Sequence, residues 1–257
     1  MSKIISIHSF RGGTGKSNIT ANLAVTVARA GNRVGVIDTD IQSPGIHVLF
    51  GLKEDKVDKA LNNYLWGECP IEDASYDVSA AARQDGEPED RVPGLFLIPS
   101  SLNAGEITRV LKEGYDIGRL NEGFRQLIDE LKLDYLFIDT HPGVNEETLL
   151  SITISDLLLV VMRPDNQDFQ GTAVTIELAR RLHVREMLLL VNKVPAGLES
   201  RVLKDHLTRT YQAEVGAVFP LNFEIVELAS SGIFCLKHPF HPFSEQIHLV
   251  AKRVMED

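Results

Sequence analysis

Residues 4–17 read Ile4-Ile5-Ser6-Ile7-His8-Ser9-Phe10-Arg11-Gly12-Gly13-Thr14-Gly15-Lys16-Ser17, and this stretch decides the fold class. An apolar strand pattern runs into a glycine-rich turn, and Ile19, Leu23 and Val27 then keep helical spacing. Glycines let consecutive backbone N–H groups converge on phosphate oxygens, and a helix N-terminus adds the positive end of its dipole. The context predicts a phosphate-binding loop; the plainer interpretation is a glycine-rich turn with an incidental lysine.

Within this loop the strict GxxxxGK[ST] pattern fails, because Phe10 stands where the first glycine belongs. The chemistry is retained by the residues that follow. Lys16 is expected to bridge the β- and γ-phosphates, and Ser17 to offer its hydroxyl to Mg²⁺. The predicted nucleotide contacts of the loop are Gly12, Gly13, Thr14, Gly15, Lys16, Ser17 and Asn18.

Carboxylates end two further strand patterns. Asp38 and Asp40 follow an apolar run, and their spacing places both on one side of a strand. Asp139 ends the run 135–138, an arrangement typical of a Mg²⁺-binding aspartate in phosphate-binding folds. Because ligands bind at the carboxyl ends of parallel strands, all three are expected near the loop. Each aspartate taken singly is also compatible with an ordinary strand end or a helix cap.

Strand-like and helix-like segments alternate along the chain. Further strands are predicted at 33–37, 95–98, 135–138, 157–162, 187–191 and 217–219, and helices at 104–113, 118–131, 168–182, 198–211 and 244–254. This alternation predicts an α/β fold with a doubly wound, mostly parallel sheet of seven to eight strands and helices on both faces. One domain is expected to span residues 1–257.

Charge is unevenly distributed over the 257 residues. The formal charge is −10, and residues 54–90 carry −8 of it, with eleven acids and three bases. The remainder is nearly neutral, so net charge does not exclude a nucleic-acid partner. Segment 54–90 is interpreted either as a partner-binding surface or as a solvated, mobile loop. The two cysteines lack metal-ligand spacing, and no signal peptide or membrane span is evident, so a cytoplasmic protein is expected.

The loop resembles the deviant Walker A motif, KGGxGK[ST], of the MinD/ParA family of P-loop ATPases, with Arg11 in place of the signature lysine. The similarity continues through the Asp38/Asp40 pair and Asp139 to Asn192 and the stretch around Pro220. The resemblance implies that Asp40 orients the attacking water and that Arg11 reaches the phosphates of a second subunit. The residues implied in catalysis are Lys16, Asp40 and Arg11, those at Mg²⁺ are Ser17, Asp38 and Asp139, and those at adenine are Asn192 and Pro220. Asn192 is also compatible with a strand-end turn residue.

The function implied by this resemblance is a Mg²⁺-dependent switch that dimerises with ATP, hydrolyses it slowly and is stimulated by a protein partner. A P-loop ligase acting on a small carboxylate and a nucleotide-binding scaffold with little hydrolysis stay open as alternatives. The predicted helix 198–211 carries Arg201, Lys204 and Arg209, which suit either nonspecific DNA binding or a solvated face. Acids outnumber bases in residues 244–257, which favours a packed helix over a membrane anchor.

Overall fold

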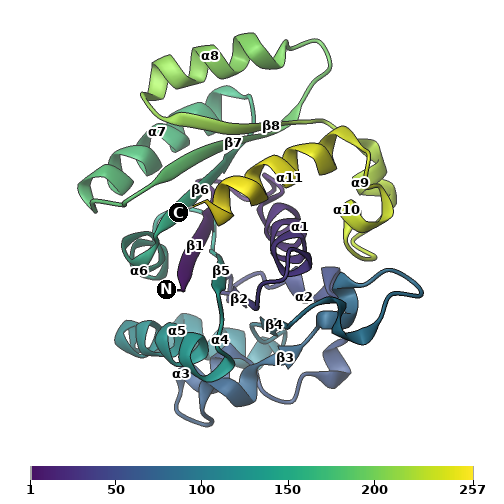
Figure 1. The fold of residues 1–257 in the computed structure, drawn as a ribbon. Coiled ribbons are helices and arrows are strands. Elements are labelled where there is room, and N and C mark those ends of the chain that lie inside the picture. Colours follow the sequence, from purple (N-terminus) through teal and green to yellow (C-terminus); the bar gives the residue numbers. More distant parts are fainter. Residues whose placement is uncertain (1, 257) are drawn as a thin grey trace.

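An eight-stranded sheet runs through the molecule in the computed structural model, which describes residues 2–256 (Figure 1). The strands are β1 (Lys3–His8), β2 (Val34–Asp38), β3 (Tyr76–Asp77), β4 (Leu95–Ile98), β5 (Tyr135–Asp139), β6 (Leu157–Met162), β7 (Met187–Val194) and β8 (Glu214–Pro220). Their order is β3-β4-β2-β5-β1-β6-β7-β8, and every pairing is parallel except that of β3 with β4. The predicted fold class is confirmed.

Helices cover both faces of the sheet. They are α1 (Lys16–Arg29), α2 (Ile46–Leu49), α3 (Leu61–Leu65), α4 (Ala104–Glu113), α5 (Ile117–Leu131), α6 (Glu146–Ile154), α7 (Asn166–Arg181), α8 (Ser200–Tyr211), α9 (Phe223–Glu227), α10 (Phe234–Lys237) and α11 (Pro242–Met255). Figure 1 shows α1, α10 and α11 on one face and α5, α6 and α7 on the other. No helix within residues 2–256 is long and apolar enough to cross a membrane.

Strand β6 shows why its sequence is apolar without interruption. Leu157, Leu159 and Val161 pack into the core beneath α1 and α11, whereas Leu158 and Val160 point to the opposite core beneath α7 and α8. Successive side chains of a strand alternate between faces, so a sheet covered on both sides needs apolar residues at every position. The same burial holds the carboxyl ends of β1, β2 and β5 at one edge of a rigid layer.

Several elements were not predicted from the sequence: the short helices α2, α3, α9 and α10, each of five residues or fewer, together with helix α6 and strand β3. Helix α6 was not predicted, because its sequence shows no clear polar and apolar stripe; Asn145 caps it by accepting a hydrogen bond from the Thr148 backbone N–H. Strand β3 has only two residues, too few for any periodicity, and pairs antiparallel with β4.

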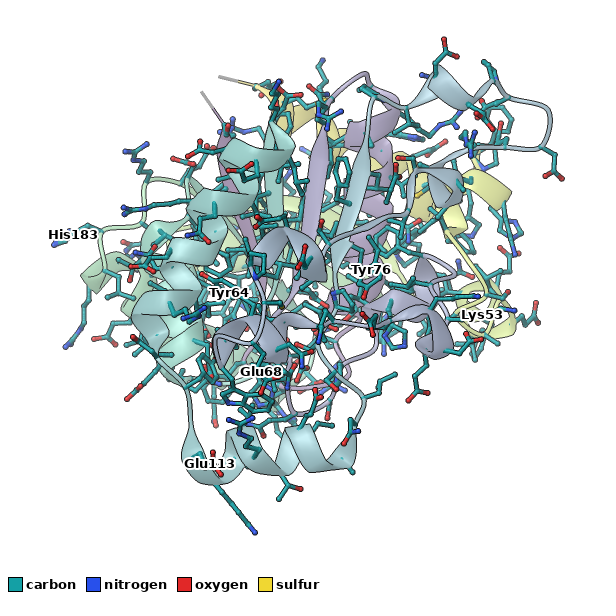
Figure 2. The ribbon with its side chains drawn as sticks, turned by 90° about the horizontal axis from the view of Figure 1, so that it is seen from below. Lys53, Tyr64, Glu68, Tyr76, Glu113 and His183 are labelled. Carbon is teal, nitrogen blue, oxygen red and sulfur yellow. The ribbon has the colours of Figure 1, made fainter. Side chains whose placement is uncertain are left out.

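The acidic segment 54–90 packs against the sheet through its apolar residues. Helix α3 buries Leu61 and Tyr64 in the core formed with α5, and β3 adds an edge strand. Figure 2 shows the underside of the molecule, with Tyr64 and Glu68 in this region above α4. Glu68 is paired with Arg109 of α4 at 2.9 Å, and Glu87 with Arg29 of α1 at 2.6 Å. Two acids of the segment therefore pair with the body of the domain.

Candidate nucleotide-binding site

The loop between β1 and α1 encloses a cavity of about 200 Å³. Gly13 and Gly15 have φ angles of 74° and 93°, which side-chain-bearing residues rarely adopt. This conformation leads directly into the N-terminus of α1 at Lys16. The cavity is lined by Ser9, Gly12, Gly13, Thr14, Gly15, Lys16, Ser17, Asn18, Asp40 and Pro142. The structure thus brings together all seven loop residues predicted to contact nucleotide.

Lys16 is buried and held by the carboxylate of Asp139. The distance from Nζ to Oδ1 is 2.9 Å, and Lys16 is only 6% exposed. Thr20 donates from its hydroxyl to the same Oδ1 at 3.1 Å. Sequence reasoning missed Thr20, although its place one helical turn after Lys16 puts both side chains on the same face of α1. The ion pair between Lys16 and Asp139 therefore holds the lysine side chain in place beneath the cavity without bound phosphate.

Asp38 lies beside Asp139, its register partner on the adjacent strand β5. Burial and then the neighbouring Asp139 carboxylate raise the pKa of Asp38 to about 8. Its side-chain oxygens accept the backbone N–H groups of Asp40 at 3.0 Å and Gly45 at 3.2 Å. If both buried carboxyl groups were ionised, Lys16 alone would not balance their charge, and oxygen ligands suit Mg²⁺. The donor set of Asp38, Asp139 and the half-buried Ser17 therefore fits this ion.

Asp40 borders the cavity and is hydrogen-bonded to His141. The imidazole Nδ1–H donates to Asp40 Oδ1 at 2.6 Å, and the backbone N–H of Ser43 donates to the same oxygen at 3.1 Å. Both side chains keep some solvent exposure, 13% for Asp40 and 22% for His141. His141 therefore orients Asp40.

A second histidine, His8, is fully buried behind the loop. Thr140 donates its hydroxyl proton to the Ile7 carbonyl, so its oxygen accepts from His8 Nδ1–H at 2.9 Å. Burial, with the nearby Lys16 charge, lowers the pKa of His8 to about 3. His8 is thus neutral at physiological pH and adds no charge behind the loop. Nothing in the local sequence signalled this residue.

The end of β7 braces the loop from the side. Asn192 donates from Nδ2 to the Thr14 carbonyl, and Lys193 donates from Nζ to the Gly13 carbonyl, each at 2.7 Å. A Cβ at Gly15 would overlap the Asn192 amide, which explains the glycine. Pro220 ends β8 opposite Val194 and is half-buried, outside the loop cavity. Asn192 therefore contacts the loop itself, and its predicted contact with adenine stays a prediction.

Arg11 is directed toward the N-terminus of α7. Its guanidinium donates to the Gln167 side chain and lies 4.0 Å from Asp168. Asp168 is itself buried and bonded to Arg163 at 3.0 Å. The Arg11 side chain is 40% exposed, so it is attached to its own subunit at the rim of the site.

Comparison with known proteins gives a consistent picture. The family described as AAA domain matches residues 2–189. An uncharacterized ATP-binding protein of Methanocaldococcus jannaschii is 32% identical over 257 residues, covering 99% of this chain and 88% of that protein. The flagellum site-determining protein YlxH of Helicobacter pylori is 30% identical over 220 residues, 84% of this chain and 66% of that protein.

A solved structure shows the same fold. The septum site-determining protein MinD from Pyrococcus horikoshii, complexed with Mg-ADP, superposes with a TM-score of 0.80 at 20% identity. The superposition covers 100% of this chain and 97% of that one. At 20% identity the structural similarity shows the fold alone. The family match and the sequence relatives show which family the chain belongs to. The chain belongs to the MinD/ParA family of P-loop ATPases.

Proposed function

We propose that this protein is a cytoplasmic, Mg²⁺-dependent switch that binds and hydrolyses ATP, dimerises in the ATP state and positions or regulates a partner. One observation carries the proposal: Lys16, Asp38 and Asp139 form a buried cluster of two carboxyl groups and one lysine under the loop, with Asp40 at the cavity edge. The relative named as a site-determining protein supports a positioning role. The activating partner is expected to be a protein.

The chemistry follows from these positions. The loop N–H groups and the N-terminus of α1 would bind the phosphates, and Lys16 would neutralise charge that develops on them. Ser17, Asp38 and Asp139 would hold Mg²⁺, which when bound supplies further charge neutralisation. Asp40, oriented by His141, would place the attacking water. Arg11 would leave α7 and contact the phosphates of a second subunit.

Size-exclusion chromatography with light scattering tests the dimer. With Mg²⁺ and ATP-γ-S the protein is expected to elute as a dimer of the 28.5-kDa chain, and with ADP as a monomer. A matched Lys16→Ala variant should stay monomeric with both nucleotides. A wild-type protein that binds ATP-γ-S and remains monomeric would refute the dimerising switch.

Turnover of Asp40→Ala separates the switch from a scaffold with little hydrolysis. Removing the group that orients the water is expected to lower kcat about 100-fold or more, with little change in nucleotide affinity. Phosphate release is measured in single turnover, so that product release does not mask the chemical step. Equal rates for the variant and the wild type would favour the scaffold.

We propose that exposed basic residues of α8 form a surface that binds DNA without sequence specificity. Arg201, Lys204 and Arg209 are exposed there, whereas Arg181 and Arg185 are paired with acids of the same subunit. Retention on a DNA column should fall as salt rises, and the triple alanine variant of the α8 residues should elute earlier. A paired control, Arg181→Ala with Arg185→Ala, should elute like the wild type. Unchanged retention of the α8 variant would exclude this surface.

A further inference from the structure

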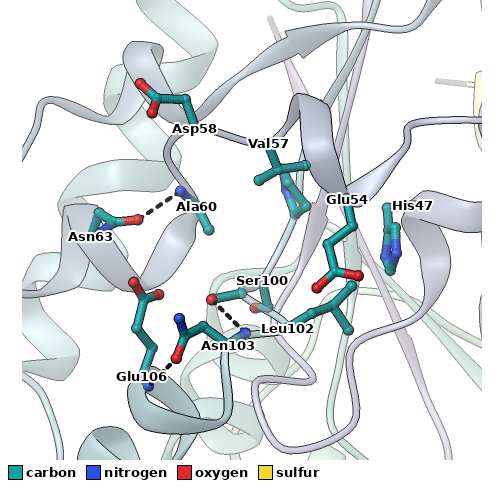
Figure 3. Close-up of a pocket in the computed structure, with 12 residues that line it drawn as sticks. His47, Glu54, Val57, Asp58, Ala60, Asn63, Ser100, Leu102, Asn103 and Glu106 are labelled. Carbon is teal, nitrogen blue, oxygen red and sulfur yellow. Dashed lines mark hydrogen bonds between the residues drawn. The ribbon is translucent and has the colours of Figure 1, made fainter.

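A second cavity lies beside the nucleotide site and is not part of it. Its volume is about 290 Å³, and its walls come from α2, the segment 54–63 and the stretch from β4 into α4 (Figure 3). The residues at its base, His47, Ala60, Ser100 and Ser101, are buried, and those at its mouth are exposed or half-buried. It is therefore a recess with a polar base and an open mouth.

The side chains around this recess carry negative charge. Glu54 reaches in from the 3-10 helix Glu54–Lys56, and Glu106 rises from α4 on the opposite side, as Figure 3 shows. Asp58 also borders the recess, with its carboxylate directed away from the cavity in Figure 3, and the lining contains no lysine or arginine. A ligand between Glu54 and Glu106 would meet acceptors on both sides. Such a lining repels a carboxylate substrate and attracts a cation.

His47 adds to the wall of this recess a buried imidazole with one nitrogen that is unpartnered within the described part of the chain. The residue is only 5% exposed and lines the recess, and its buried Nδ1 has no hydrogen-bond partner among residues 2–256. Burial lowers the pKa of this imidazole, with Glu54 opposing the effect, so the neutral form dominates at pH 7. A neutral imidazole offers one acceptor nitrogen. Buried polar atoms without partners are uncommon in folded proteins and mark places where a donor belongs.

We propose that this recess binds an organic cation, an alkyl ammonium or guanidinium group with several N–H donors. Its volume lies near the lower end of small-ligand pockets and suits one long basic side chain or a small free amine. Glu54 and Glu106 would pair with the charge, and the hydroxyl oxygen of Ser100 would accept a remaining N–H group. The cation can come from a free small molecule or from the lysine or arginine of a bound peptide.

The recess is connected to the nucleotide site through two elements. Ser100 lines the recess and donates from its hydroxyl to the Asp38 carbonyl at 2.7 Å. His47 lies on α2, which begins just after Gly45, whose N–H donates to the Asp38 carboxylate. A bound cation would therefore contact Ser100, which is itself hydrogen-bonded to the proposed Mg²⁺ ligand Asp38. This position is suited to regulation.

Calorimetric titration without nucleotide tests the site independently of ATP hydrolysis. The probes are N-acetyl-arginine amide and its neutral isostere N-acetyl-citrulline amide, which differ only in the charged group, with agmatine as a free small cation. The arginine probe should bind at least about tenfold more tightly than citrulline, and added salt should weaken it. Comparable binding of agmatine and the capped arginine would fit a peptide source, whereas agmatine binding at least about tenfold more tightly than the capped arginine would fit a free small molecule.

Binding measurements on variants of the lining carboxylates test whether the cation binds in this recess. Glu54→Gln combined with Glu106→Gln should weaken the arginine probe or agmatine about tenfold or more, while circular dichroism confirms the fold. The matched control is Glu89→Gln, an exposed acid of the same segment outside the recess, which should bind like the wild type. Equal affinity for citrulline, an unaffected double variant, or displacement of the probe by stoichiometric Mg²⁺ would each overturn the proposal.

Discussion

At the scale of single residues, the ionised form of Asp38 is destabilised by its surroundings in the site. The side chain is 1% exposed and adjoins Asp139, and its pKa is raised to about 8 from an ordinary value of 3.8. The folded chain therefore keeps a proton that the unfolded chain releases above pH 4. Such a group lowers the free energy of unfolding as pH rises through this window. This loss of folding stability is characteristic of functional sites, where charged groups are arranged to bind a ligand.

Replacing Asp38 by Asn should remove this dependence on pH. Without nucleotide, the stability of Asp38→Asn relative to wild type should increase by roughly 3–4 kcal/mol between pH 5 and pH 8. Thermal unfolding of both proteins across this range measures the difference, with exposed Asp85→Asn as control. A constant offset between the curves would show that Asp38 ionises normally.

His141 acts on the reaction through Asp40. Because its Nδ1–H fixes one carboxylate oxygen at 2.6 Å, His141→Ala should leave Asp40 in several rotamers. We expect kcat to fall about tenfold with an unchanged nucleotide dissociation constant, since His141 does not line the cavity. His141→Asn, which can still donate, should recover part of the rate, and exposed His183→Ala (Figure 2) should change nothing. A weakened nucleotide affinity in His141→Ala would point to a structural role instead.

At the scale of elements, α7 is packed directly against the phosphate loop. Gly171 of α7 lies under Phe10, and a Cβ at that glycine would overlap the phenyl ring. Phe10 is the residue that breaks the strict loop pattern, and the structure gives it a packing partner. The loop therefore rests on two supports, Asn192 from β7 and the small surface of α7 around Gly171.

A double-mutant cycle tests the contact between these elements. Gly171→Ala should destabilise the protein by about 1–3 kcal/mol through overpacking, more than the gain of about 1 kcal/mol in helix propensity. In a Phe10→Ala background the same change should be neutral or stabilising, because the ring is gone. Denaturant unfolding of the four proteins gives the coupling energy. Additive effects would show that the residues do not contact each other.

At the scale of the whole molecule, Arg11 connects the monomer to its proposed dimer. In the single chain it contacts Gln167 and Asp168, so dimerisation has to exchange these contacts for phosphates of the second subunit. Arg11→Ala should bind ATP-γ-S as the wild type does but fail to dimerise, and Arg11→Lys should dimerise. Light scattering with Mg²⁺ and ATP-γ-S measures both. A dimeric Arg11→Ala would place Arg11 outside the interface.

Much of this architecture was predictable because its signals are local. The glycines of the loop, the helical spacing after Lys16 and the uninterrupted apolar run of β6 each lie within a few neighbouring residues. Strand β3 and helix α6 escaped prediction, since one is too short for a period and the other lacks a polar stripe. The predicted site residues from Gly12 to Asn18 and Asp40 line one cavity, whereas the other predicted site residues lie outside its lining: Arg11, Asp38, Asp139, Asn192 and Pro220.

By itself the sequence determined a nucleotide loop at the edge of a parallel α/β sheet, because glycine backbone freedom and hydrophobic periodicity act over short stretches of chain. Only the tertiary structure decided what surrounds the loop. His141 meets Asp40 across 101 positions and Asn192 meets Thr14 across 178, contacts that depend on the order of strands in the sheet. The raised pKa of Asp38 and the acidic recess beside it have the same origin, since burial and charge proximity arise only when distant segments pack together.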